Sequence, residues 1–255
     1  MNTKPSLPDG PARDSRFAVV ERWAELANFP PGDPQRRVEF YHRQMNEEVD
    51  SLECSARNIT DFPAADWNLR VDLARQCSDE SRHSKMFRRF FERAGGHAGQ
   101  YPVISFQYRI VTAIPTLIGR LAVQNRSFEA GGIDAISAEI AEAKERGDEE
   151  EQALFEAQLA DEIGHVRFAN EYINAAIKSD GRTVHAIGRA MTFSSDAFGY
   201  LMGSAAASGA TYPADRSSRK EAGFRNDEVE LAVAVAEKIR AEDAANRTAS
   251  GQASS

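Results

Sequence analysis

The chain has 255 residues, of which 42% are hydrophobic, and 31 basic against 39 acidic side chains give a formal net charge of −8. This length and composition suffice for one domain with a sizeable core. The acidic balance argues against a nucleic-acid partner, because binding to phosphates requires a basic surface.

The cysteines and the N-terminus favour a soluble, cytoplasmic protein. The two cysteines, Cys54 and Cys77, form no Cys-x-x-Cys pair, which argues against a zinc knuckle and a disulfide framework. The first residues lack the apolar stretch of a signal peptide. No run reaches the roughly 18 apolar residues that cross a bilayer, so we expect no membrane partner.

Residue spacing predicts helices and no strand in the first part of the chain. Prolines make residues 1–15 an irregular arm, and a short helix is expected over about 17–28. A long helix is expected over about 34–60, because apolar residues recur there every three or four positions. The DFP segment at 61–63 ends it, and a second long helix follows to about residue 94.

Helices also dominate the rest of the chain. Five helical segments are expected, over about residues 111–129, 135–146, 149–178, 183–206 and 227–244. Pro115 is expected to kink the first of them, and Gly131-Gly132 to interrupt the chain after it. Small polar residues predict a disordered tail over 246–255. Four long helices with short connections predict an all-α bundle, as a single domain over residues 16–245.

Glutamates occupy positions at which this spacing predicts a buried residue. Glu80, Glu129 and Glu162 each lie on the apolar face of their helix. A buried carboxylate is costly unless it is paired with a cation or binds a metal ion. These glutamates are therefore candidate metal ligands.

A repeated motif strengthens this interpretation. The sequences DESRH at 79–83 and DEIGH at 161–165 share the pattern Asp-Glu-x-x-His, and a further glutamate precedes each, at Glu53 and Glu129. A glutamate and a histidine three residues apart lie on one helical face, as in bundles that bind two iron or manganese ions. The predicted ligands are Glu53, Glu80, His83, Glu129, Glu162 and His165.

The residue types suit this chemistry. Glutamates can bridge two cations, and imidazoles give each metal a neutral nitrogen. Asp79 and Asp161 are candidate acceptors for the histidine nitrogen that does not bind metal, which would fix its tautomer. The ligand set suits an Fe/Fe and a Mn/Fe pair equally.

Spacing leaves the first-helix ligand open, and the chain contains a third Glu-x-x-His pair. Glu48 and Glu53 lie to either side of the apolar stripe of their helix, and spacing alone does not choose between them. A third Glu-x-x-His pair, Glu39 and His42, has no preceding aspartate and no upstream glutamate, and we interpret it as a solvated helix start.

The motifs resemble those of the ferritin-like diiron-carboxylate superfamily. DESRH is similar to the Asp-Glu-x-Arg-His signature of its bacterial multicomponent monooxygenases. Residues 52–83, 127–172 and 219–230 resemble more closely an uncharacterised ferritin-like branch related to the tRNA-modifying diiron hydroxylases. The resemblance implies a ferritin-like four-helix bundle with additional N- and C-terminal helices, and it selects Glu53 as the first-helix ligand.

The favoured hypothesis is a diiron oxygenase or oxidase that uses dioxygen to hydroxylate, N-oxygenate or desaturate a small organic substrate, with an external electron donor. The additional helices favour it, because they can form a substrate pocket. The alternatives are an iron-handling or oxidant-scavenging protein, a tRNA-base hydroxylase, and a bundle whose Glu and His side chains form a satisfied polar core. Bundles of this type often form homodimers, but the sequence does not decide the oligomeric state.

Overall fold

The computed structural model describes residues 4–203 and 212–252, and this part of the chain is all-α, as predicted. Among the described residues, extended segments pair only in an isolated parallel bridge between Val19 and Val103. None of the described helices has a stretch that is long and apolar enough to cross a membrane.

The helices form two compact units. The first comprises the described part of residues 1–125 and 172–206, and the second comprises the described part of residues 126–171 and 207–255. The single domain expected over residues 16–245 and the ferritin-like arrangement stay predictions.

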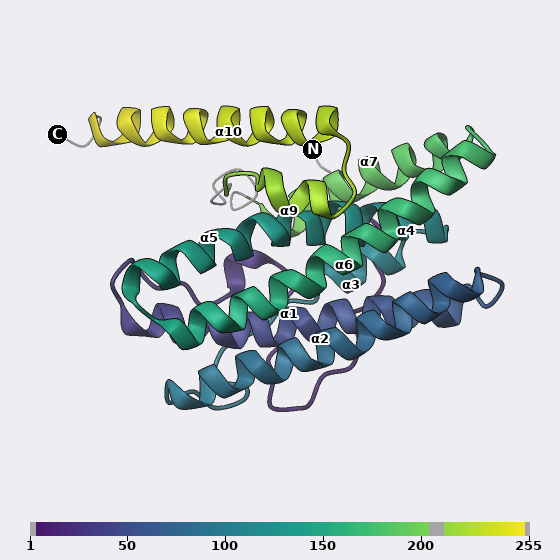
Figure 1. Ribbon diagram of the computed structural model, residues 1–255. Coiled ribbons are helices and arrows are strands. Elements are labelled where there is room, and N and C mark those ends of the chain that lie inside the picture. The colour runs from purple at the N-terminus through teal and green to yellow at the C-terminus, as the bar shows by residue number, and fades with distance from the viewer. Residues whose placement is uncertain (1–3, 204–211, 253–255) are drawn as a thin grey trace. The chain divides into compact units, whose positions relative to one another are not determined.

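Two long antiparallel helices form the main body of the first unit. α1 spans Pro34–Asp61, and the carboxylate of Asp33 caps it by accepting a hydrogen bond from a backbone N–H of the first turn (2.8 Å). α2 spans Trp67–Arg93, and Asp66 caps it in the same way. Such caps satisfy donors that the first turn of a helix leaves without partners. The two helices lie side by side (Figure 1).

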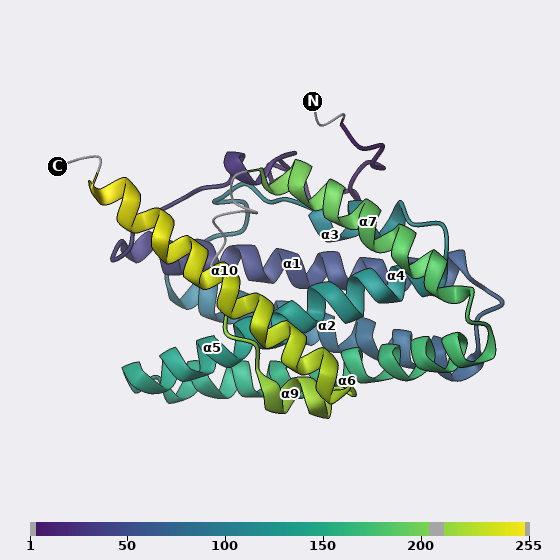
Figure 2. The same ribbon diagram turned by 90° about the horizontal axis from the view of Figure 1, so that it is seen from above.

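Three further helices belong to this unit: α3 (Phe106–Thr112), α4 (Leu117–Val123) and α7 (Thr183–Met202). The sequence predicted that Pro115 would kink one continuous helix. Instead, Pro115 lies between two separate helices, α3 and α4, because proline cannot donate a backbone hydrogen bond. α7 packs on α4 at Gly119 (Figure 2). A Cβ atom at Gly119 would lie 2.9 Å from the Cβ of Ala190, so only glycine allows this approach.

A π-helix begins at the end of the first unit. η2 spans Gln124–Glu129, and α5 (Ala130–Arg146) continues it without a break. The interruption predicted at Gly131-Gly132 is therefore wrong; the irregular turn precedes these glycines. Hydrogen bonds in a π-helix join residues five apart, and such turns occur frequently at functional sites.

The second unit is built from α5, from α6 (Glu149–Ser179) as far as Glu171, and from two later helices, α9 (Arg216–Glu221) and α10 (Asn226–Gln252). Gly147, with a φ angle of +69°, ends α5 in the left-handed conformation that favours glycine. The buried core residues of this unit include Ala130, Ile133, Ile163, Val166 and Ala222. Of the tail expected to be disordered over 246–255, residues 246–252 continue α10, and residues 253–255 lie outside the described residues.

The N-terminal segment does not form the helix predicted over residues 17–28. The described part of this segment contains one short 3-10 helix, η1 (Trp23–Glu25). The N–H of Val20 donates to the carbonyl of Val103 (2.8 Å), and the N–H of Val103 donates to the carbonyl of Ala18 (2.9 Å). In these bonds the backbone N–H and C=O groups of the segment pair with distant residues, whereas in a helix they would pair with residues four positions away.

Arg13 fixes this segment to α1. Its guanidinium donates to both carboxylate oxygens of Glu53 (2.9 and 2.7 Å) and to Asp50 (3.3 Å). The side chains of Arg13 and Asp50 are only 8% and 1% exposed, so the ion pair is shielded from water. Burial raises the pKa of Asp50 to about 7, and the N–H of Tyr108 and the charge of Arg13 oppose this shift.

We expect Arg13→Ala to lower the free energy of unfolding by about 3 kcal/mol, because it leaves a buried carboxylate without its cation. Urea denaturation monitored by circular dichroism would measure the loss. Arg16→Ala is the matched control, since Arg16 forms an exposed ion pair with Asp14, which water screens, and its loss should change the stability little. Equal effects of the two substitutions would contradict the buried role of Arg13.

α1 also buries His42. Its ring lies against those of Phe17, Phe91 and Tyr101, with centroid separations of 5.7, 5.1 and 5.6 Å. The side chain is fully buried, and neither ring nitrogen has a hydrogen-bond partner among the residues that the structure describes. The interpretation of Glu39 and His42 as a solvated helix start is therefore wrong, because both residues are buried.

Burial, together with the smaller effect of the charge of His97, lowers the pKa of His42 to about 4. The unfolded chain takes up a proton on this residue as the pH falls below about 6.5, while the folded protein does not. Stability is therefore lost between about pH 6.5 and pH 4, by up to about 3 kcal/mol. His42→Leu should remove this part of the acid destabilisation, as measured by urea denaturation from pH 8 to pH 4.5.

The control for this prediction is His185→Leu, because His185 is exposed on α7 and lies outside the buried ring cluster around His42. A His42→Leu variant whose stability falls as steeply with acid as that of the wild type would contradict the prediction.

Candidate metal centre

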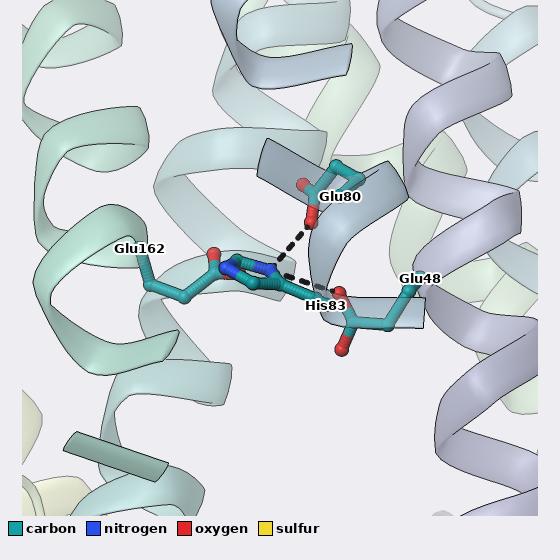
Figure 3. A group of neighbouring side chains, drawn as sticks. All are labelled: Glu48, Glu80, His83 and Glu162. Atoms are coloured by element: carbon teal, nitrogen blue, oxygen red, sulfur yellow. Dashed lines mark hydrogen bonds and ion pairs between the residues drawn. The ribbon is translucent and has the colours of Figure 1, made fainter. Parts of the chain in front are cut away.

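A first group of potential metal ligands lies within the first unit. Glu48 of α1 and Glu80 and His83 of α2 each offer a ligand atom, and these atoms lie within 4.8 Å of one another. The Nδ1 atom of His83 is 3.1 Å from Oε2 of Glu80 and 3.3 Å from Oε2 of Glu48 (Figure 3). The three residues are 6%, 1% and 0% exposed. We call Glu48, Glu80 and His83 the first ligand group.

Helix geometry explains this arrangement. Glu80 and His83 are three residues apart on α2, which places both side chains on one helical face. The face continues to Leu73 on one side and to Phe87 on the other, and both are buried. Buried apolar residues thus lie on this face in both directions beyond the polar residues.

Glu48, and not Glu53, is the α1 glutamate of this group. At 3.6 residues per turn, side chains five positions apart point about 140° away from each other, so the two cannot share a face. Glu53 is directed to Arg13, which binds both of its carboxylate oxygens. Burial raises the pKa of Glu53, and Arg13 opposes this shift.

A second group lies within the second unit. Glu129 at the end of η2 and Glu162 and His165 of α6 offer ligand atoms that also lie within 4.8 Å of one another. The Nδ1 atom of His165 is 3.5 Å from Oε2 of Glu162. The three residues are buried. We call Glu129, Glu162 and His165 the second ligand group.

The two aspartates of the repeated motif, Asp79 and Asp161, lie on α2 and α6, each directly before a glutamate of a ligand group. Asp79 lies 3.6 Å from both Arg75 and Arg82 on its own helix. Asp161 is half-buried on α6, directly before Glu162. Their role as acceptors for the histidine rings stays a prediction.

The residues present fit a metal ion. Carboxylate oxygen and imidazole nitrogen suit divalent iron, manganese and zinc. Each ligand group offers two carboxylates, which a buried site must neutralise, and one histidine, which adds a neutral donor. These buried Glu and His residues could therefore hold metal ions.

Sequence reasoning did not find several buried polar residues near the first ligand group, among them Ser51, Gln76 and Gln124. Ser51 and Gln76 both donate to Oε1 of Glu80, at 2.8 and 3.3 Å. Their spacing could have identified two of them, because residues three or four positions apart share a helical face. Ser51 is three residues from Glu48, and Gln76 is four residues from Glu80.

We expect Glu48→Ala to weaken metal binding much more than Glu53→Ala. Glu48 offers an oxygen within the first ligand group, whereas Glu53 is bound by Arg13. Loss of one ligand should reduce the affinity for Co²⁺ by at least roughly tenfold, since even residues that only support a ligand contribute that much. Calorimetric titration of both metal-free variants would measure this. A greater loss in Glu53→Ala would support the choice of Glu53 from the sequence.

Comparisons with known proteins place the chain in one family. No curated protein and no solved structure matches it. A protein-family match extends over residues 2–230 and includes both ligand groups. The chain therefore belongs to the family described as "Protein of unknown function (DUF455)".

Proposed function

We propose that the two ligand groups together hold two iron ions, in an enzyme that uses dioxygen to oxidise a small organic substrate. The observation that carries the proposal is a repetition. Each compact unit contributes two buried glutamates and one buried histidine, with ligand atoms within 4.8 Å of one another. Two such groups are the ligand set of a helical bundle that binds two metal ions.

The course of the chain connects the two groups through helices. The boundary between the units falls between Asn125 and Arg126, inside η2, and again between Glu171 and Tyr172, inside α6. The second ligand group therefore lies on helical segments that continue into the first unit.

Charge also supports the proposal. Four ionised glutamates would carry a charge of −4, which two divalent cations neutralise, while the histidines bind as neutral imidazoles. Buried carboxylates without such compensation would destabilise the fold. The affinity should fall with decreasing pH, because protons compete with the metal for these ligands.

Iron is supported by the resemblance of the repeated Asp-Glu-x-x-His motif to ferritin-like diiron-carboxylate proteins, although the same ligands suit a Mn/Fe pair. Bound iron would supply the reduction of dioxygen, for which the protein provides ligands and a dry environment. Hydroxylation of a C–H bond consumes one dioxygen, two electrons and two protons, and releases water. An external electron donor is therefore part of the proposal.

The first test is the metal content of protein produced with iron. We expect about two irons per chain, and a strong loss in Glu80→Ala and Glu162→Ala, which remove one ligand from each group. Glu53→Ala is the control and should retain the metal. Metal-free protein obtained under iron-replete conditions would remove the central claim and leave a satisfied polar core as the explanation.

The second test addresses the reaction. Mixing the anaerobic ferrous protein with dioxygen should oxidise the iron and give a transient visible absorption. Consumption of dioxygen together with an organic compound and a reductant would support the oxygenase. Oxidation of iron without turnover of any organic compound would favour an iron-handling protein instead.

A further inference from the structure

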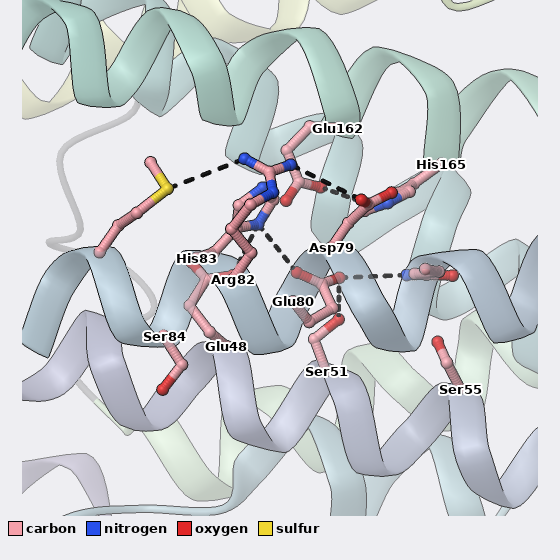
Figure 4. Close-up of polar contacts among 12 residues, drawn as sticks. Glu48, Ser51, Ser55, Asp79, Glu80, Arg82, His83, Ser84, Glu162 and His165 are labelled. Atoms are coloured by element: carbon pink, nitrogen blue, oxygen red, sulfur yellow. Dashed lines mark hydrogen bonds and ion pairs between the residues drawn. The ribbon is translucent and has the colours of Figure 1, made fainter.

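Two hydrogen-bonded paths meet at one oxygen of Glu80. Ser51 of α1 donates to Oε1 of Glu80 (2.8 Å), and Gln76 of α2 donates to the same atom (3.3 Å). The other oxygen, Oε2, lies beside Nδ1 of His83 (3.1 Å). Figure 4 shows Ser51 and His83 on different sides of the Glu80 carboxylate. The two oxygens of Glu80 therefore have different surroundings.

Both paths run through the first two residues of the π-helix. Gln124 donates through Nε2 to the hydroxyl of Ser51 (3.4 Å), and Asn125 donates through Nδ2 to Oε1 of Gln76 (3.1 Å). Gln76, Gln124 and Asn125 are fully buried, and Ser51 is 6% exposed. Water is thus excluded from competition for these bonds.

The direction of the longer path is fixed at both ends. Arg120 can only donate, and its Nη1 atom donates to Oδ1 of Asn58 (3.3 Å). The amide nitrogen of Asn58 then donates to Oε1 of Gln124 (3.2 Å), which directs the amide nitrogen of Gln124 towards Ser51. The path ends at the carboxylate of Glu80, which only accepts when it is ionised.

Arg120 is itself held firmly. It donates to the carboxylate of Asp61 (2.8 Å) and to the backbone carbonyls of Ile114 and Thr112 (2.8 and 3.2 Å). Its side chain is 6% exposed. Arg120, at which the longer path starts, is therefore fixed by the ends of α1 and α3 and by the loop between α3 and α4.

We propose that Gln124 and Asn125 are positioning residues for Glu80: through Ser51 and Gln76 they hold Oε1, and they leave Oε2, beside His83, as the oxygen that binds a metal ion. This inference rests on the proposed metal-binding function and deepens it. It gives the π-helix a second task besides carrying Glu129, namely to orient a ligand on α2. Residues that hold a metal ligand in this way typically change metal affinity by roughly 10–100-fold.

The probe is Co²⁺ added to metal-free protein under anaerobic conditions, with affinity from calorimetry and ligand geometry from the visible absorption of the bound ion. Ser51→Ala and Gln124→Met should each weaken binding by roughly 10–100-fold and alter the spectrum. Ser51→Thr keeps the hydroxyl and should restore both. Melting curves of the metal-free variants verify that each one folds.

Ser55→Ala is the matched control. Ser55 also accepts a hydrogen bond from Gln124 (3.1 Å), but Ser55 is not a member of the two paths that lead to Glu80. This variant should keep the wild-type affinity and spectrum. A loss as large as that in Ser51→Ala would show that general packing around Gln124 matters, and would overturn the inference.

A double variant tests whether Gln124 acts through Ser51. If it does, Gln124→Met should have little further effect in the Ser51→Ala background, whereas independent roles would give additive losses. Additive losses would overturn this inference but not the proposed metal binding. Wild-type affinity in folded Ser51→Ala and Gln124→Met would do the same. Failure of the wild-type protein to bind Co²⁺ and iron would overturn the proposed function as well, so the two failures are distinguishable.

Discussion

The cost of burying carboxylates governs this structure. Removing an ionised glutamate from water is unfavourable unless a cation or several hydrogen-bond donors replace the lost hydration. The first unit meets this requirement in two ways on one helix. Asp50 and Glu53 of α1 receive the guanidinium of Arg13, whereas Glu48 lies against His83 and within reach of Glu80. The first arrangement is complete within the chain, and the second offers donor atoms to a metal ion.

The positions of the long helices could be predicted from the sequence because their signals are local. Apolar residues every three or four positions and terminal prolines and glycines located α1, α2 and α6 to within a few residues. The Glu-x-x-His motifs were equally accessible, since two residues three positions apart share a face wherever the helix lies. Glu80 and His83, like Glu162 and His165, are indeed adjacent and buried.

The remaining features depend on contacts that spacing does not encode. The buried face of α1 carries Glu48, Ser51, Ser55 and Asn58, so its most apolar stripe is not its most buried one. This polar face explains why Glu48 could not be selected from hydrophobic periodicity. The π-helix also escaped prediction, because Gln124 and Asn125 take part in buried hydrogen bonds with residues 49 to 73 positions away. The N-terminal segment is extended for the same reason: its partners, such as Val103, are distant in the sequence.

The way the N-terminal segment is attached also has a consequence for the order of folding. α1 and α2 are joined by a short connection and pair along their length, so their contacts close only a small loop. Arg13 reaches Glu53 across 40 positions, and Arg109 binds the carbonyl of Pro8 across 101 positions. Contacts between distant residues form late, because the entropy of loop closure must be overcome first. The helical hairpin that carries the first ligand group is therefore expected to assemble before the segment that covers its opposite face.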